Sequence, residues 1–125
     1  MARNNHLDIY QDTYRFCREV FRVKQKLPKI LKYDLGEKMG VSSLVLIKAI
    51  VIANGSKDKT KALTTMALEI DVLWVYLRLA HDFKGITRGE FQVLSELLHE
   101  ISKQNKNWLA WARKNTKESM DTRDK

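Results

Sequence analysis

The chain has 125 residues, of which 44% are hydrophobic and 30% charged, with one proline and five glycines. This length suits one domain, and this balance is typical of a folded globular protein, because a disordered chain has too little apolar surface to offset its ordering entropy. One cysteine excludes an internal disulfide and a thiolate metal cluster, and a formal charge of +8 favours polyanions or acidic surfaces as partners.

The first predicted helix covers about residues 7–26, where apolar residues recur at helical spacing. Four of them form a stripe that we expect to face the core: Tyr10, Tyr14, Cys17 and Phe21. Three arginines recur at i, i+3 and i+7 and align on a separate, outward stripe: Arg15, Arg18 and Arg22.

The second predicted helix begins at Pro28, which suits a first helical turn, and ends before Asn54-Gly55. Gly36 and Gly40 lie inside it and lower helix propensity, so we expect a kink or close backbone packing there. The longest apolar run, residues 44–53, is interrupted by Lys48 and too short to span a bilayer. The N-terminus also lacks the apolar core of a signal peptide, so we expect a cytoplasmic protein without a membrane segment.

The third predicted helix covers about residues 62–83 and has two apolar seams. The first suits a bundle interior: Leu63, Met66, Ile70, Leu73, Leu77 and Ala80. The second lies roughly opposite: Leu68, Val72, Val75, Leu79 and Phe83. A four-helix core of this size needs only one such face, so we expect the second to be covered by self-association into a homo-oligomer.

The fourth predicted helix starts at Thr87, whose T-x-x-E pattern with Glu90 is a capping box, and continues to about Asn115. Its seam is Phe91, Leu94, Leu98, Ile101, Asn105, Trp108 and Ala112. The sequence thus predicts an all-α, antiparallel four-helix bundle over residues 1–115, followed by a charged, disordered tail over residues 116–125.

The chemistry of an enzyme is missing from the sequence. The three histidines are scattered, and the single Glu96-x-x-His99 pair has no second copy of the kind that di-iron bundles use, so we expect no metal and no cofactor. Cys17 is expected to be a buried, inert thiol. Nucleotide-binding loops and hydrolase motifs are absent, so we do not expect catalysis.

Positive charge is concentrated in one half of the chain: residues 15–61 hold twelve basic and four acidic residues, whereas residues 62–100 hold three and six. Such a strip suits phosphate contacts without base specificity. The alternative is a solvated surface offset by neighbouring acids, but a net charge of +8 that survives removal of the tail argues against complete offset. The predicted binding residues for nucleic acid or a partner are Arg15, Arg18, Arg22, Lys24, Lys26, Lys29, Lys32, Arg78, Lys103, Lys106, Arg113 and Lys114.

Five short motifs occur in the order L-P-K at 27–29, Y-D-L-G at 33–36, A-N-G at 53–55, L-R-L-A at 77–80 and W-L-A-W at 108–111. In this order the sequence resembles the four-helix bundle family of accessory variability determinant (Avd) proteins from diversity-generating retroelements. The family also includes proteins encoded in intervening sequences of bacterial 23S ribosomal RNA genes, whose second-helix stop usually reads N-I-A-E-G. Here the stop reads I-A-N-G, which lacks that acid.

The resemblance implies a barrel-shaped homopentamer with a basic surface that binds a reverse transcriptase and its template RNA and supports mutagenic cDNA synthesis. It also implies that Arg78, within the family's Leu-Arg motif, helps to contact the polymerase. The residues alone offer a second interpretation, in which Arg78 pairs with Asp82 one turn along the helix.

Three alternatives stay open at this point. The first is an RNA-associated bundle of the ribosomal type without a polymerase partner. The second is a structural or protein-interaction bundle without affinity for nucleic acid. The third is an enzyme whose site is assembled across an oligomer interface.

Overall fold

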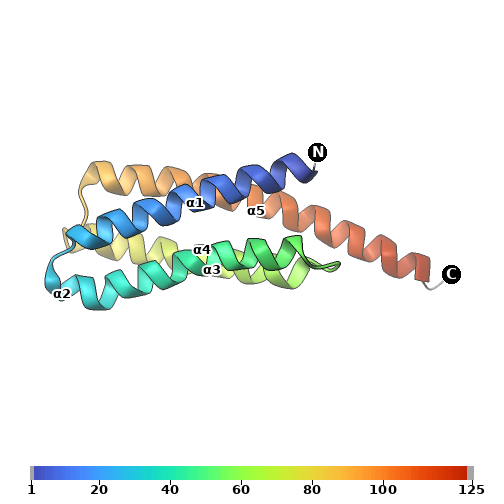
Figure 1. The fold of residues 1–125 in the computed structure, drawn as a ribbon, viewed down its shortest axis with the longest axis horizontal. Helices are drawn as coiled ribbons and strands as arrows, with labels where there is room; N and C mark the ends of the chain where they lie inside the picture. The colour runs from blue at the N-terminus through green and yellow to red at the C-terminus, as the bar shows by residue number, and fades with distance from the viewer. Residues whose placement is uncertain (1, 124–125) are drawn as a thin grey trace.

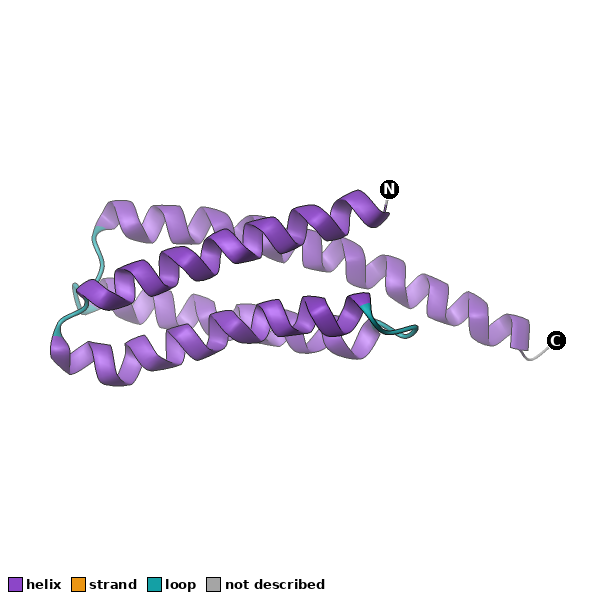
Figure 2. Ribbon diagram, in the orientation of Figure 1, coloured by secondary structure: helices purple, strands orange, loops and turns teal. Residues whose placement is uncertain are grey.

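The computed structural model describes the backbone of residues 2–123 and the side chains of residues 8–116. These residues form helices and no strand, as Figure 2 shows. The elements are α1 (Ala2–Lys26), α2 (Lys29–Leu31), the π-helical turn η1 (Lys32–Gly36), α3 (Glu37–Asn54), α4 (Thr60–Asp82) and α5 (Arg88–Arg123). Because α2, η1 and α3 follow one another directly, the chain builds four long helical rods.

The rods run alternately up and down and pack side by side (Figure 1). α1 packs against α3 and α5, and α4 packs against the same two helices, so α1 and α4 occupy diagonal corners. The far end of α5 projects beyond the other rods (Figure 1). The predicted all-α class and four-helix bundle are confirmed.

The core is formed by apolar seams that meet along the bundle axis. The first predicted seam of the third helix is confirmed, since each of its six residues on α4 is at most 1% exposed. The seam of α5 is also buried, apart from Phe91, which is half-buried. Within this seam Asn105 donates from Nδ2 to the Leu63 carbonyl oxygen at 3.2 Å, which ties α5 to α4.

The predicted core stripe of α1 is wrong for three of its four residues. Tyr10, Tyr14 and Phe21 are 41%, 54% and 36% exposed, and only Cys17 is buried. The core positions of α1 are instead occupied by Ile9, Thr13, Phe16, Val20, Val23 and Leu27. These alternate by three and four residues, and they put one aromatic and four aliphatic side chains inside, whereas the tyrosines keep their hydroxyl groups at the surface.

The second rod contains the irregularity expected near its glycines. Its backbone forms the π-helical turn η1, which ends at Gly36, before regular α-helix resumes. A Cβ at Gly36 would lie 3.0 Å from Leu27 Cδ1, and one at Gly40 would lie 3.4 Å from the Phe21 ring. Both glycines therefore allow α1 to approach the second rod closely.

The helix ends follow the local signals. α3 ends at Asn54, and the Lys59 ammonium group donates to the Ala53 and Ser56 carbonyls at 2.8 and 2.6 Å. The capping box of α5 is confirmed: the Glu90 amide donates to Thr87 Oγ1 at 3.1 Å, and the Thr87 amide donates to Glu90 Oε1 at 2.8 Å.

The predicted end of the last helix at Asn115 is corrected, because α5 continues to Arg123. Residues 116–123 contain neither glycine nor proline, so nothing local stops the helix there. The structure thus gives helical backbone over most of the segment for which disorder was expected, and residues 124–125 lie outside the described residues.

Candidate nucleic-acid interface

The three predicted arginines of α1 share one exposed stripe, as their spacing indicated. Arg15, Arg18 and Arg22 are all exposed. Arg22 lies 3.3 Å from the Glu19 carboxylate, and the ion pairs of residues 8–116 include neither Arg15 nor Arg18. The stripe rises about 10 Å along the helix, in steps of about 4.5 and 6 Å between successive arginine positions.

The lysines around the turn after α1 are largely engaged in holding the bundle together. Lys24 is 3.1 Å from Glu37 and stands over the Phe21 ring, 5.6 Å from its centroid. Lys26 lies 2.5 Å from the Glu90 carboxylate of α5. Lys32 donates to the Gln25 carbonyl at 3.4 Å, and Lys29 is exposed. For Lys24 and Lys26 the interpretation as charges offset by neighbouring acids therefore holds.

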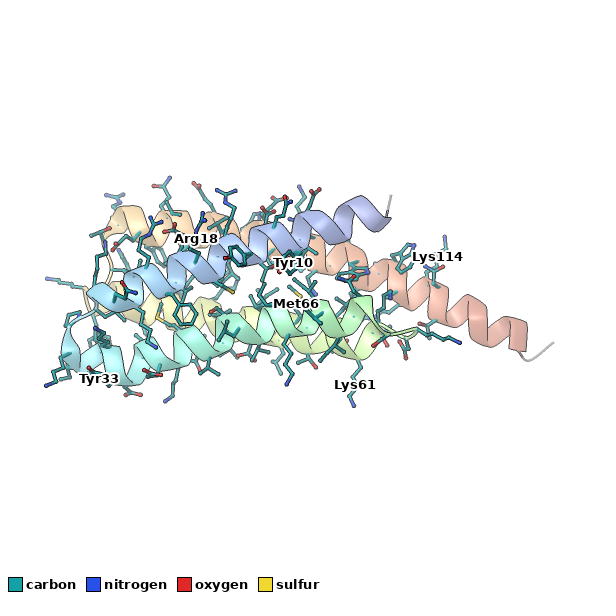
Figure 3. The ribbon with its side chains drawn as sticks, viewed as in Figure 1. Tyr10, Arg18, Tyr33, Lys61, Met66 and Lys114 are labelled. Atoms are coloured by element: carbon teal, nitrogen blue, oxygen red, sulfur yellow. The ribbon has the colours of Figure 1, made fainter. Side chains whose placement is uncertain are left out.

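The basic residues of α5 begin beside α1 and continue past it. Gln104 donates to the Asp12 carboxylate at 2.7 Å, which places Lys103 next to α1. The hollow at this junction is shared by one lysine and three acids, namely Lys103, Asp8, Asp12 and Glu100. Lys106, Arg113 and Lys114 are exposed further along α5, and Figure 3 shows Lys114 toward its projecting end.

Arg78 does not join these groups. It is exposed on α4, the rod diagonal to α1, and therefore lies on a different rod from the arginine stripe. Its expected pair with Asp82 is not formed, since the ion pairs within residues 8–116 do not include it. The predicted set is therefore spread over several rods, with Arg78 alone on α4.

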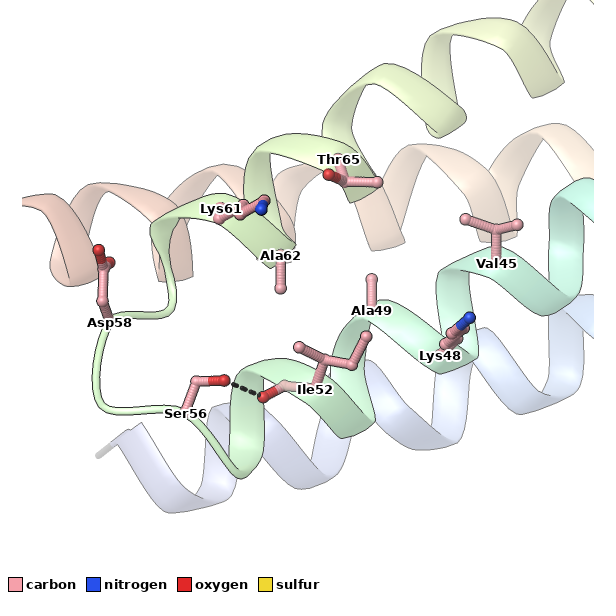
Figure 4. A pocket seen from close by; sticks show the side chains of 9 residues that line it. All are labelled: Val45, Lys48, Ala49, Ile52, Ser56, Asp58, Lys61, Ala62 and Thr65. Atoms are coloured by element: carbon pink, nitrogen blue, oxygen red, sulfur yellow. Dashed lines mark hydrogen bonds between the residues drawn. The ribbon is translucent and has the colours of Figure 1, made fainter.

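A further basic group surrounds a hollow between α3 and α4, outside the predicted set. The hollow has a volume of about 500 Å³, and Figure 4 shows Ala49 and Ala62 facing each other across it. Lys48 and Lys61 stand among its mostly apolar lining. The lysine-rich sequence after α3 signalled Lys61 but not Lys48, which lies within α3, and Asp58 adds one acid to the same lining.

Three described groups have a pKa shifted by their surroundings, namely Cys17, Asp58 and Glu90. Burial raises the pKa of the Cys17 thiol, which donates to the Ser43 carbonyl at 3.2 Å, so the thiol stays protonated and unreactive. Hydrogen bonds from Thr60 lower the pKa of Asp58, and those from Lys26 and Thr87 lower the pKa of Glu90. These two carboxylates cap helices and remain ionised.

Neither a metal-binding cluster nor a membrane-spanning helix occurs among the described residues. In that part of the chain no three histidine, cysteine or acidic side chains gather as a metal site would require. None of its helices is long and apolar enough to cross a membrane.

The sequence model of a protein family described as bAvd-like matches residues 7–112. The chain belongs to the bAvd-like family. This confirms the resemblance seen in the short motifs, and the matched range covers parts of all four rods while leaving out the projecting end of α5. The family is an accessory, non-catalytic kind of protein associated with diversity-generating retroelements. A search of curated proteins found no match.

Proposed function

We propose that this chain is a non-catalytic accessory subunit of a diversity-generating retroelement, which binds RNA and cDNA together with the element's reverse transcriptase and supports mutagenic cDNA synthesis. The observation that carries the proposal is the bAvd-like family match over residues 7–112. The exposed cations supply the physical means, because arginine and lysine contact phosphates of any sequence. Such a subunit works in the cytoplasm, beside the polymerase.

The arginines of α1 are the strongest candidates for RNA and cDNA contact. Arg15 and Arg18 form no ion pair within residues 8–116, so docking to phosphates breaks no existing contact for them. Lys106, Arg113 and Lys114 extend the positive surface along α5. Arg78, on the diagonally placed α4, is the candidate contact for the polymerase, so one subunit could hold nucleic acid and enzyme on different rods.

Self-association into a ring or barrel, with five copies as the expected number, belongs to the same proposal. In the second predicted seam, Leu68 and Val75 of α4 are 65% and 56% exposed, and Phe83, directly after the helix, is 66% exposed. Val72 of the same seam is half-buried. The adjoining hollow between α3 and α4 offers space for side chains of a neighbouring copy. Covering this apolar face would remove it from water, which favours assembly.

The first experiment is a titration of fluorescent single-stranded RNA with the purified protein at several salt concentrations, followed by anisotropy. We expect affinity to fall steeply with salt, with a slope of about −0.7 for each neutralised phosphate. Absence of binding even at low salt would favour the protein-interaction bundle instead.

The second experiment is co-purification with the reverse transcriptase encoded beside this gene. Retention of the polymerase supports the retroelement role. Salt-dependent RNA binding without any retained polymerase, or a gene without a neighbouring reverse transcriptase, would favour the alternative of an RNA-associated bundle of the ribosomal type.

A further inference from the structure

We propose that the outer face of α1 is a binding platform for single-stranded nucleic acid, on which Tyr10 and Tyr14 stack against bases while Arg15, Arg18 and Arg22 hold the adjoining phosphates. This inference rests on the proposed function, because it names the site through which the RNA or cDNA would be held. It rests equally on an unexpected feature of the fold, the exposure of rings that the sequence pattern assigned to the core.

Tyr10, Tyr14, Arg18 and Arg22 follow one another at intervals of four residues. Side chains at this spacing are neighbours on a helix surface, so they form one ridge of two rings followed by two guanidinium groups. Arg15 lies beside the ridge, and a shallow hollow of about 360 Å³ is lined by Tyr10, Gln11, Tyr14 and Arg15. Figure 3 labels Tyr10 and Arg18 on the same helix.

The two tyrosine rings are available to a ligand. They are 41% and 54% exposed, and no hydrogen bond of residues 8–116 engages either hydroxyl group. Phe21 differs, because its ring packs against Gly40 and under the Lys24 ammonium group. The rings of Tyr10 and Tyr14 are separated by a rise of about 6 Å along the helix, which leaves each free to receive its own base.

The chemistry of the ridge favours a single-stranded polyanion over a second copy of the chain. An exposed ring offers a stacking surface to any base, and adjacent guanidinium groups suit the phosphates that follow it. A second copy carries a charge of +8 and would have to cover three guanidinium groups that have one carboxylate partner, Glu19, among residues 8–116. The aliphatic seam of α4 is better suited to contact between copies.

The test replaces rings without changing charge. Tyr10→Leu with Tyr14→Leu removes both aromatic surfaces, whereas Tyr10→Phe with Tyr14→Phe keeps them and removes only the hydroxyl groups. Tyr33→Leu is the control for loss of an exposed ring, since Tyr33 is 67% exposed but lies in η1 and not on α1. Affinity for fluorescent single-stranded RNA and for duplex RNA is measured across the same salt series, and circular dichroism verifies helicity.

We expect the double leucine variant to bind single-stranded RNA about 25-fold more weakly, about fivefold for each lost ring, with an unchanged salt slope. The double phenylalanine variant and Tyr33→Leu should stay within about twofold of the parent, and duplex affinity should hardly change because paired bases cannot stack on the rings. This combination would separate stacking from phosphate contact.

Three results would overturn the inference in different ways. If the parent binds RNA and the leucine variant binds equally well, the rings are not a platform, although the proposed function survives. If the leucine variant changes the oligomeric state measured by light scattering, the ridge is a contact between copies. If the parent itself binds no RNA at low salt, the proposed function fails first and this inference fails with it.

Discussion

The outer faces of α1 and α4 lie on diagonal corners of the same bundle and differ in chemistry. Both expose apolar side chains at helical spacing, but α1 exposes Tyr10 and Tyr14 among arginines, whereas α4 exposes aliphatic residues such as Leu68 and Val75. Rings beside guanidinium groups suit bases and phosphates, and an aliphatic seam suits another protein surface. The residues beside an exposed apolar stripe therefore indicate which kind of ligand or protein surface the stripe binds.

The largest expected effect is the difference in stability between a change on the inner face of α4 and one on its outer face. Leu73→Ala removes a fully buried side chain and should lower the free energy of unfolding by about 2 to 5 kcal/mol. Leu68→Ala, on the exposed seam, should change it by about 0.5 kcal/mol or less at the lowest protein concentration. Urea unfolding measures both, and equal losses would show that the two faces of α4 are buried alike.

Charge placed on the α4 seam should break contact between copies. Leu68→Glu with Val75→Glu would bury two carboxylates without partners and should weaken association by about 2 kcal/mol or more, roughly 30-fold. Light scattering over a range of concentrations follows the oligomer. Val93→Glu on α5, where Val93 is 46% exposed, is the control. An oligomer that tolerates the α4 change would place its interface elsewhere.

A smaller effect on stability should come from removing the cap at the start of α5, the helix that packs against both α1 and α4. Thr87→Ala removes the hydroxyl group that accepts from the Glu90 amide, and it should cost about 1 kcal/mol of folding free energy. Thr64→Ala, at an exposed position within α4, should instead stabilise by up to about 0.7 kcal/mol, because alanine is the better helix former. Thermal unfolding compares the two, and a neutral Thr87 change would show that water replaces the cap.

The smallest expected effect is a change in folding stability at acidic pH. The Lys26 and Thr87 hydrogen bonds lower the pKa of Glu90 below its ordinary value of 4.5, so the carboxylate contributes stability above that pH. This contribution should be lost as the pH falls through the lowered pKa. Glu90→Gln should be less stable near neutral pH and should lose less stability on acidification. Identical acid profiles would mean that the Lys26 contact at the end of α1 does not contribute.

Sequence patterns were sufficient where only one arrangement satisfies them. The inner seam of α4 and the capping box of α5 follow from spacing and hydrogen-bonding chemistry, and both are present. Sequence patterns were insufficient on α1. Two adjacent stripes there have helical spacing, and only packing against α3 and α5 decides which one is buried. For that reason Tyr14 lies at the surface and Phe16 lies in the core.

The candidate site was predictable in part. Exposure of the α1 arginines follows from their position away from the core. Pairing depends on residues distant in sequence, so the engagement of Lys24 with Glu37 and of Lys26 with Glu90 emerges only when the rods pack. The same packing places Arg78, on α4, at the corner diagonal to α1. A short sequence motif cannot predict this separation of Arg78 from the α1 arginines.

The most direct test of the account is the salt dependence of RNA binding by the variant in which Arg15, Arg18 and Arg22 are all alanine, beside a variant with Lys48, Lys57 and Lys61 changed to glutamine. Both lose three charges, but only the first alters the outer face of α1. We expect the arginine variant to bind single-stranded RNA about 100-fold more weakly at about 0.1 M salt, with a slope flattened by about 2. The lysine variant should keep most of the slope. Equal losses in the two variants would contradict a defined interface on α1 and leave only diffuse attraction by net charge.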